Sequence, residues 1–165
     1  MHNTLLAEND GKRVFAVVLD AGDEAFACIS CFANDHAISA ASITAIGAFQ
    51  TATVGFFDIE TKTYLDIPVD EQSEVLSLIG DIAEGDDGRA SLHLHAVLGL
   101  RDGSTRGGHL LKATVRPTLE VIVTEMPGHL RRRKVEALGI ALPGSGTIPA
   151  THADRIRAAE ASGRE

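Results

Sequence analysis

The sequence has few aromatic residues, which make up 4% of its 165 positions, and it has no tryptophan. Its apolar residues are mainly Ala, Val, Ile and Leu, and together the hydrophobic types account for 44% of the chain. The length is typical of one domain with a core of its own. Because a core poor in aromatic side chains gains less per residue from burial, we expect self-association to bury further apolar surface.

Long hydrophobic runs are also missing. No stretch of 18 or more apolar residues is present, which excludes a membrane-spanning helix of ordinary length. Residues 1–10 lack the basic start and apolar centre of a secretory signal. We therefore expect a cytoplasmic protein without a membrane partner.

Positively charged residues are fewer than negatively charged ones. The chain has 15 Lys and Arg against 23 Asp and Glu, a formal net charge of −8. Since affinity for the phosphate backbone comes from Lys and Arg, this balance disfavours direct binding to DNA. One basic run, residues 131–134, lies beside a helix-like segment, and we interpret it as a solvated or subunit-pairing surface.

The two cysteines, Cys28 and Cys31, form a Cys-Ile-Ser-Cys motif. In a redox enzyme such a motif lies at the N-terminus of a helix, directly after a strand. Here the pattern of apolar residues predicts a helix that begins near Asp23, with Asp23 as its cap, and ends near residues 34–36. Both thiols would then share one face in mid-helix, which favours apolar packing over redox chemistry.

The rest of residues 13–125 is predicted to be mainly strand. A buried strand is expected over residues 13–20, and residues 39–58 predict two strands or one strand bent at a bulge. Pro68 restricts residues 62–69 to an edge or a strand end. The turn at residues 84–88 connects residues 73–83 to residues 91–100 as a hairpin. Two further strands, residues 110–115 and 118–125, complete the expected sheet.

The last forty residues differ in character. We assign residues 12–135 to the domain and residues 136–165 to a C-terminal extension that is in part disordered. Its residues 153–161 have the composition of a short helix or of a disordered segment.

Three of the seven histidines lie within seventeen residues. His93 and His95 alternate with apolar residues, so in a strand both imidazoles project from the same face. The turn residues 101–104 let the chain fold back and bring His109 beside them, and Gly107 and Gly108 permit close backbone approach. Three neutral imidazoles with an open fourth position are the ligand set of many zinc sites.

A second interpretation remains open, in which the three histidines are half-exposed and make ordinary hydrogen bonds. Imidazole also suits copper, nickel and iron, so zinc is the expected metal but the ligand set alone does not select it. The other four histidines lie in no such arrangement, and we interpret them as surface or helix-end residues: His2, His36, His129 and His152.

The order of these motifs resembles the bacterial type of the PPC domain, the plants-and-prokaryotes conserved domain, over roughly residues 12–135. The motifs are residues 44–49, 54–58 and 75–80, the paired histidines, and residues 107–110. The resemblance implies an α/β (α+β) fold with a strongly bent, mainly antiparallel sheet, one main helix after the first strand, and assembly as a trimer. It also implies that His93, His95 and His109 are the metal ligands, and that the fold is similar to acetolactate decarboxylase, a zinc enzyme with three histidine ligands.

Three functions follow, in order of preference. The first is a zinc-binding homotrimer that acts as a ligand-binding or regulatory module. The second is a zinc-dependent enzyme on a small carbonyl or carboxylate substrate, in which an adjacent arginine orients the small anion. The third is DNA binding, a label given to the family because its plant members carry an AT-hook. This chain has no Arg-Gly-Arg-Pro hook, and its net charge opposes the third reading.

Overall fold

The computed structural model describes residues 1–144 except residues 11, 127 and 136–138. This part of the chain contains one helix, α1 (Ala25–Asp35), and nine strands. The strands are β1 (His2–Asn9), β2 (Lys12–Asp20), β3 (Ala40–Asp58), β4 (Thr63–Val69), β5 (Ser73–Glu84), β6 (Ala90–Gly99), β7 (Thr105–Glu125), β8 (Arg131–Val135) and β9 (Ile140–Gly144).

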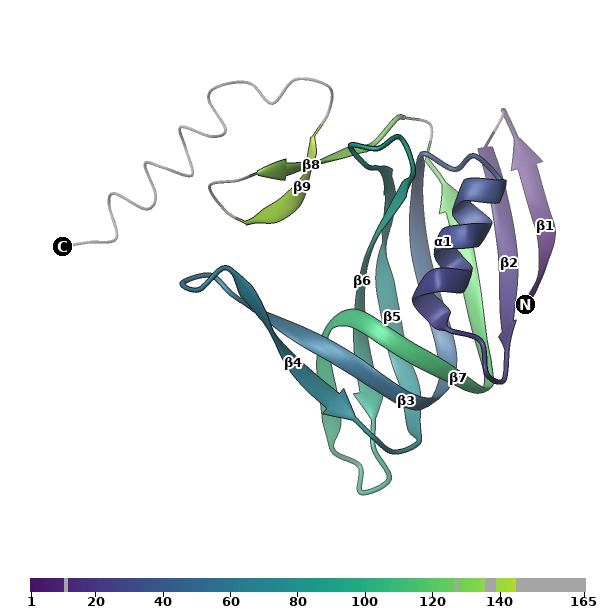
Figure 1. Cartoon of the computed structure of the whole chain (residues 1–165). Coiled ribbons are helices and arrows are strands. Elements are labelled where there is room, and N and C mark those ends of the chain that lie inside the picture. Colours follow the sequence, from purple (N-terminus) through teal and green to yellow (C-terminus); the bar gives the residue numbers. More distant parts are fainter. Residues whose placement is uncertain (11, 127, 136–138, 145–165) are drawn as a thin grey trace.

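The described strands form one bent sheet in the order β1-β2-β7-β3-β5-β8-β9, with β4 paired to β3 and β6 paired to both β5 and β7 (Figure 1). The pairings are antiparallel except for that between β5 and β8. Strand β7 pairs with β2 through residues 118–124 and with β6 through residues 105–109. Because β5 and β7 also both pair with β3, the strands β3, β5, β6 and β7 curl into a closed ring.

The core lies between this sheet and α1, which covers one of its faces (Figure 1). Along β6, Leu94, Ala96 and Leu98 are buried, whereas the alternate residues His95 and Val97 are exposed. This period of two places one set of side chains against α1 and the other set on the outer face of the sheet. The expected bent, mainly antiparallel sheet with one helix is confirmed, although the helix follows the second strand rather than the first.

The N-terminus of α1 is capped one residue later than the sequence predicts. Glu24, not Asp23, is the cap, and its Oε2 accepts from the backbone N–H of Ala27 at 2.7 Å. Its Oε1 accepts from the backbone N–H of Ala113 at 3.1 Å, which ties the start of α1 to β7. Asp23 instead accepts from the backbone N–H of Asp20 in the preceding turn. A carboxylate that satisfies two donors on different elements outcompetes the neighbouring carboxylate as the cap.

The single strand β3, with register shifts against both neighbours, confirms one of the two alternatives predicted for residues 39–58, a strand bent at a bulge. Other strand predictions need correction, since β7 continues through Pro117, whose peptide bond is cis. The sheet does not end at residue 125, since the basic run forms β8, and β1 was not expected. The edge position of β4 is confirmed, because within the described chain it pairs only with β3. The suggested segment 153–161 lies outside the described residues.

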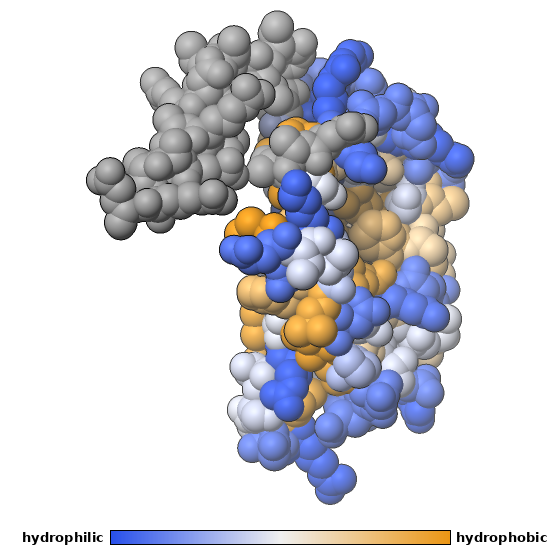
Figure 2. All heavy atoms as spheres, turned by 60° about the vertical axis from the view of Figure 1, so that its left-hand side comes forward, coloured by the Kyte–Doolittle hydropathy of each residue, from blue (hydrophilic) through white to orange (hydrophobic). Residues whose placement is uncertain are grey.

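Apolar side chains remain exposed on the outer face of the sheet. Ile79 on β5 pairs with Thr44, which also pairs with Ile122 on β7, so the three side chains form one row. We call Ile46, Ile79, Val97 and Ile122 the outer apolar patch, and their exposed fractions are 61%, 55%, 42% and 38%. Figure 2 turns the side with β4, β8 and β9 forward and shows apolar residues gathered among polar ones.

One ion pair fastens the end of α1 to the sheet. Arg13 on β2 donates from Nε and Nη2 to the two carboxylate oxygens of Glu125, at 2.8 and 2.6 Å, and from Nη2 to the carbonyl of His36. Hydrogen bonding to Arg13 lowers the pKa of Glu125, and burial opposes this only in part. The pair therefore links β2, β7 and the C-terminal end of α1.

We expect Arg13→Ala to lower the free energy of unfolding by about 1–2 kcal/mol at pH 7, because a bidentate, partly buried pair is lost. A carboxylate whose pKa is lowered in the folded state contributes its full stabilisation at pH values above the ordinary pKa of Glu. This stabilisation is lost as the pH falls through the lowered pKa. Urea unfolding at pH 7 and in strong acid should therefore show the difference from wild type shrink in acid. The exposed Arg89→Ala is the control, and an equal difference at both pH values would contradict the account.

Candidate metal centre

The structure brings together the three histidines that the sequence singled out. His93 and His95 project from the same face of β6, and His109 lies directly opposite His95 on β7. The connecting turn is held by the backbone N–H of Leu100, which donates to the carbonyl of Ser104 at 2.8 Å. The strand period and the turn residues together therefore place three imidazoles on one surface.

The ring nitrogens converge closely. His93 Nε2 lies 3.1 Å from His95 Nε2 and 3.2 Å from His109 Nδ1. Zinc–nitrogen bonds are about 2.0–2.1 Å long, so two ligands at a tetrahedral angle lie about 3.3–3.4 Å apart. The observed separations are within a few tenths of an ångström of that value, and the donor set fits a divalent transition metal. Among the described residues no fourth metal-ligating side chain joins the cluster, which leaves a coordination position open.

A glycine directly before His109 makes this approach sterically possible. A Cβ at position 108 would lie 2.5 Å from the carbonyl oxygen of Gly55, on the neighbouring strand β3. Gly55 is itself the register partner of His109. The close backbone approach expected from the glycine pair is thus present at Gly108, and a larger residue would push His109 away from β3.

The cluster favours neutral imidazoles. Burial lowers the pKa of His109 to about 4, and the repulsion of charge on His95 and His93 contributes further. Burial also lowers the pKa of His93, with smaller contributions from the positive charges of Arg132 and His95. Because a metal ligand must offer an unprotonated nitrogen, both histidines are ready to bind a cation at neutral pH.

The histidines open into a cavity of about 510 Å³ between the sheet and the β8–β9 hairpin. The ring of Tyr64, on β4, stands edge-on to His109 with centroids 5.0 Å apart, and it packs against Phe57. The remaining described lining includes Ser91 and the β9 residues Ile140 and Leu142. The cavity therefore combines one cluster of imidazole nitrogens with largely apolar walls, as small-molecule sites do.

Arg132 also lines this cavity, and the sequence reasoning missed it. We assigned the basic run to the protein surface, but Arg132 is only 5% exposed. Its Nη1 donates to the carbonyl of Ser91 at 2.8 Å, and its Nη2 donates to Asp81. Ser91 and Asp81 belong to β6 and β5, so only the tertiary pairing reveals the site. The run Arg131–Lys134 is basic at every position, so the sequence itself carried no signal that Arg132 is buried while Arg131 and Arg133 are exposed.

The cysteines give no sign of redox chemistry. Both lie within α1 as predicted, with Cys28 half-buried against the core and Cys31 exposed. Burial raises the pKa of the Cys28 thiol, and a hydrogen bond to Asp35 raises that of Cys31. Reactive cysteines have lowered pKa values instead. The apolar packing predicted for both thiols holds for Cys28 only.

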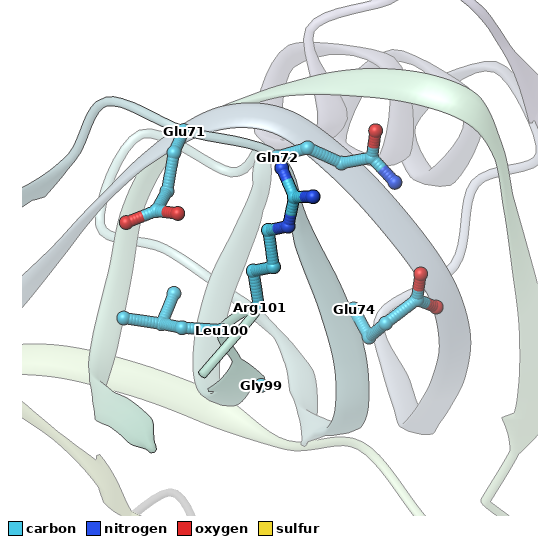
Figure 3. A pocket seen from close by; sticks show the side chains of 6 residues that line it. All are labelled: Glu71, Gln72, Glu74, Gly99, Leu100 and Arg101. Carbon is cyan, nitrogen blue, oxygen red and sulfur yellow. The ribbon is translucent and has the colours of Figure 1, made fainter. Parts of the chain in front are cut away.

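A second hollow lies at the other end of β6 and has a different character. Figure 3 shows Arg101 beside Gln72, with Glu71 and Glu74 on either side, and all four side chains are exposed. In the described part of the chain, no histidine or cysteine lines it.

No helix among the described residues has the length and apolar character needed to span a membrane.

Comparison with known proteins identifies relatives of similar size. The model of the Plants and Prokaryotes Conserved (PCC) domain matches residues 6–127. A plant- and prokaryote-conserved (PPC) protein from Pyrococcus horikoshii is 30% identical with a TM-score of 0.76, and the match covers 82% of this chain and 94% of that one. A metal-containing protein from Archaeoglobus fulgidus is 32% identical with a TM-score of 0.75, and covers 88% and 99% of the two chains.

More distant matches concern the fold or a short segment. α-Acetolactate decarboxylase from Bacillus subtilis is 15% identical with a TM-score of 0.53, and the match covers 84% of this chain but 62% of the enzyme. That likeness shows a shared fold alone. A dihydroxy-acid dehydratase from Halothermothrix orenii is 67% identical over 30 residues, which are 18% of this chain and 5% of that protein.

Proposed function

Since the chain belongs to the Plants and Prokaryotes Conserved domain family, we propose that it is a homotrimeric metal-binding module in which His93, His95 and His109 hold one zinc ion. The observation that carries the proposal is the convergence of three ring nitrogens, in which His93 Nε2 lies 3.1 Å from His95 Nε2 and 3.2 Å from His109 Nδ1 and all three lie within 4.8 Å of one another. The metal-containing relative from Archaeoglobus fulgidus supports it. Bound zinc would supply a Lewis acid with an exchangeable position, as three-histidine sites do.

We propose that the trimer forms through the outer apolar patch. The inner face of the sheet is already covered by α1, whereas Ile46, Ile79, Val97 and Ile122 are exposed. Burying a side chain of this size contributes about 1.5–3 kcal/mol to association. These side chains therefore favour contact with a second copy of the chain over contact with solvent. The number three comes from the resemblance of the sequence to the PPC domain.

A zinc-dependent enzyme is the second candidate, favoured by the cavity beside the histidines. Its walls would enclose a small substrate while an oxygen atom of that substrate took the open position. The described lining contains no carboxylate that could act as a general acid or base. For this reason a ligand-binding or regulatory module remains the first choice.

DNA binding ranks third. Two similar structures, from Bacteroides thetaiotaomicron and Ralstonia eutropha, are described as candidate DNA-binding proteins. The net charge of −8 on each subunit opposes direct contact with phosphates, and a trimer would multiply it.

Titration of the metal-free protein with cobalt(II) tests the proposal, because the visible spectrum of cobalt reports its coordination geometry. We expect saturation at one equivalent per chain with the strong absorption of a four-coordinate ion, and a spectral shift when azide is added to the open position. Absence of saturable binding would contradict the metal site. A spectrum that azide leaves unchanged would instead contradict the open position and remove the enzyme alternative.

A further inference from the structure

A guanidinium with an unused hydrogen-bond donor lies in the wall of the cavity beside the histidines. Arg132 is held from two sides, since Nη1 donates to the backbone carbonyl and hydroxyl of Ser91 and Nη2 donates to Asp81. The Nε–H is buried and has no partner in the described part of the chain. Buried N–H groups in folded proteins nearly always have an acceptor, so this donor marks a place for one.

The charge balance of the cavity favours an anion. Arg132 is the only charged side chain in the described lining beside the neutral histidines, and this lining contains no carboxylate. The positive charge of Arg132 is paired with the carboxylate of Asp81, which is not among the described lining residues. A divalent ion on three neutral imidazoles adds two positive charges that no described lining residue compensates. A cleft whose charged groups have one sign concentrates ligands of the opposite sign.

The walls favour an organic anion over an inorganic one. Phe57, Tyr64, Ile140 and Leu142 give the cavity apolar surface beside its charged groups. Phosphate or bicarbonate would leave this surface in contact with water, whereas an aliphatic group would cover it. The volume of about 510 Å³ is ample for an acid of a few carbons.

We propose that the cavity binds a small aliphatic carboxylic acid, with its carboxylate held by the Nε–H edge of Arg132 and its carbon chain against Phe57, Tyr64 and Leu142. A carboxylate matches the planar guanidinium in geometry and charge. A further oxygen next to the carboxylate, as in a 2-oxo or 2-hydroxy acid, would strengthen binding when the histidines hold a metal. This inference rests on the proposed function for that last contribution and for the two positive charges of the metal ion.

The test is calorimetric titration of zinc-loaded and metal-free protein with 2-oxobutanoate, butanoate, 2-butanone and phosphate. We expect 2-oxobutanoate to bind most tightly to the loaded protein, and butanoate to bind both forms and more tightly than phosphate. The neutral ketone should not bind measurably. Arg132→Gln should weaken binding of both acids by about 10- to 100-fold. Arg133→Gln, an exposed neighbour on the same strand, is the matched control and should leave binding unchanged.

The two proposals fail separately. Zinc binding without any binding of the acids, or acid binding that Arg132→Gln leaves unchanged, would overturn the inference while the metal site stands. Arg132-dependent binding of butanoate to a protein that takes up no zinc would support the inference while the metal site fails. Should Arg132→Gln not fold, the Nε–H resonance of Arg132 in wild-type protein gives the answer. It should shift on addition of butanoate, and an unmoved resonance would overturn the inference.

Discussion

The double variant His93→Ala, His95→Ala is expected to lose metal affinity by at least about a thousandfold while keeping its fold. Loss of a group that only orients a ligand already costs about 10- to 100-fold in metal affinity, and this variant removes two of the three ligands themselves. The fold should persist because the opposite face of β6, with Leu94 and Ala96, carries the core. Competition with a chromophoric chelator measures the affinity, and circular dichroism checks the sheet.

The matched control for this experiment is His2→Ala, His129→Ala, which removes the same number of imidazoles from outside the cluster. His2 is largely exposed on β1, and His129 lies near the surface beside Glu84. We expect wild-type affinity for this control. Stoichiometric metal retained by the His93, His95 variant would defeat the assignment of the ligands.

Replacing Ile79 by Asp is expected to convert the proposed trimer to monomers. Ile79 lies in the middle of the outer apolar patch, 55% exposed in the single chain, between Thr44 on β3 and His95 on β6. Three copies would each bury a carboxylate without a partner, at a cost of several kcal/mol for each ion. Sedimentation velocity should show a mass near 17.4 kDa for the variant and about three times that for wild type.

Ile59→Asp is the control, because Ile59 is 77% exposed in the β3–β4 turn and lies outside the outer apolar patch. It should leave the mass of the assembly unchanged. A wild-type protein that sediments as a monomer at micromolar concentration would contradict the trimer. A trimeric Ile79→Asp variant would place the interface elsewhere.

The three histidines could be found from the sequence because the signals are local. Strand alternation fixes the relative directions of His93 and His95, and a four-residue turn fixes the return of His109. The position of α1 follows in the same way from apolar spacing, whereas the bend of the whole sheet is expected only from the resemblance to the PPC domain. The histidine cluster and α1 depend on neighbours a few positions away.

Arg132 could not be found in this way. Its burial depends on the pairing of β8 with β5. In this pairing Arg131 lies opposite Glu84, which is 47 positions earlier in the chain. Nothing in the basic run itself distinguishes a guanidinium that closes a cavity from one in solvent, and an arginine is rarely buried unless paired. The partners that make burial possible, Asp81 and Ser91, are visible only once the sheet is assembled.

Elemental analysis of the protein, purified without a histidine tag and without added metal, tests the central claim most directly. The account predicts close to one equivalent of zinc per chain, lost in the His93→Ala, His95→Ala variant and kept in the His2→Ala, His129→Ala control. A protein that contains no metal as purified, and binds none when zinc is supplied, would contradict it. The three histidines would then be polar surface residues that hydrogen-bond to one another.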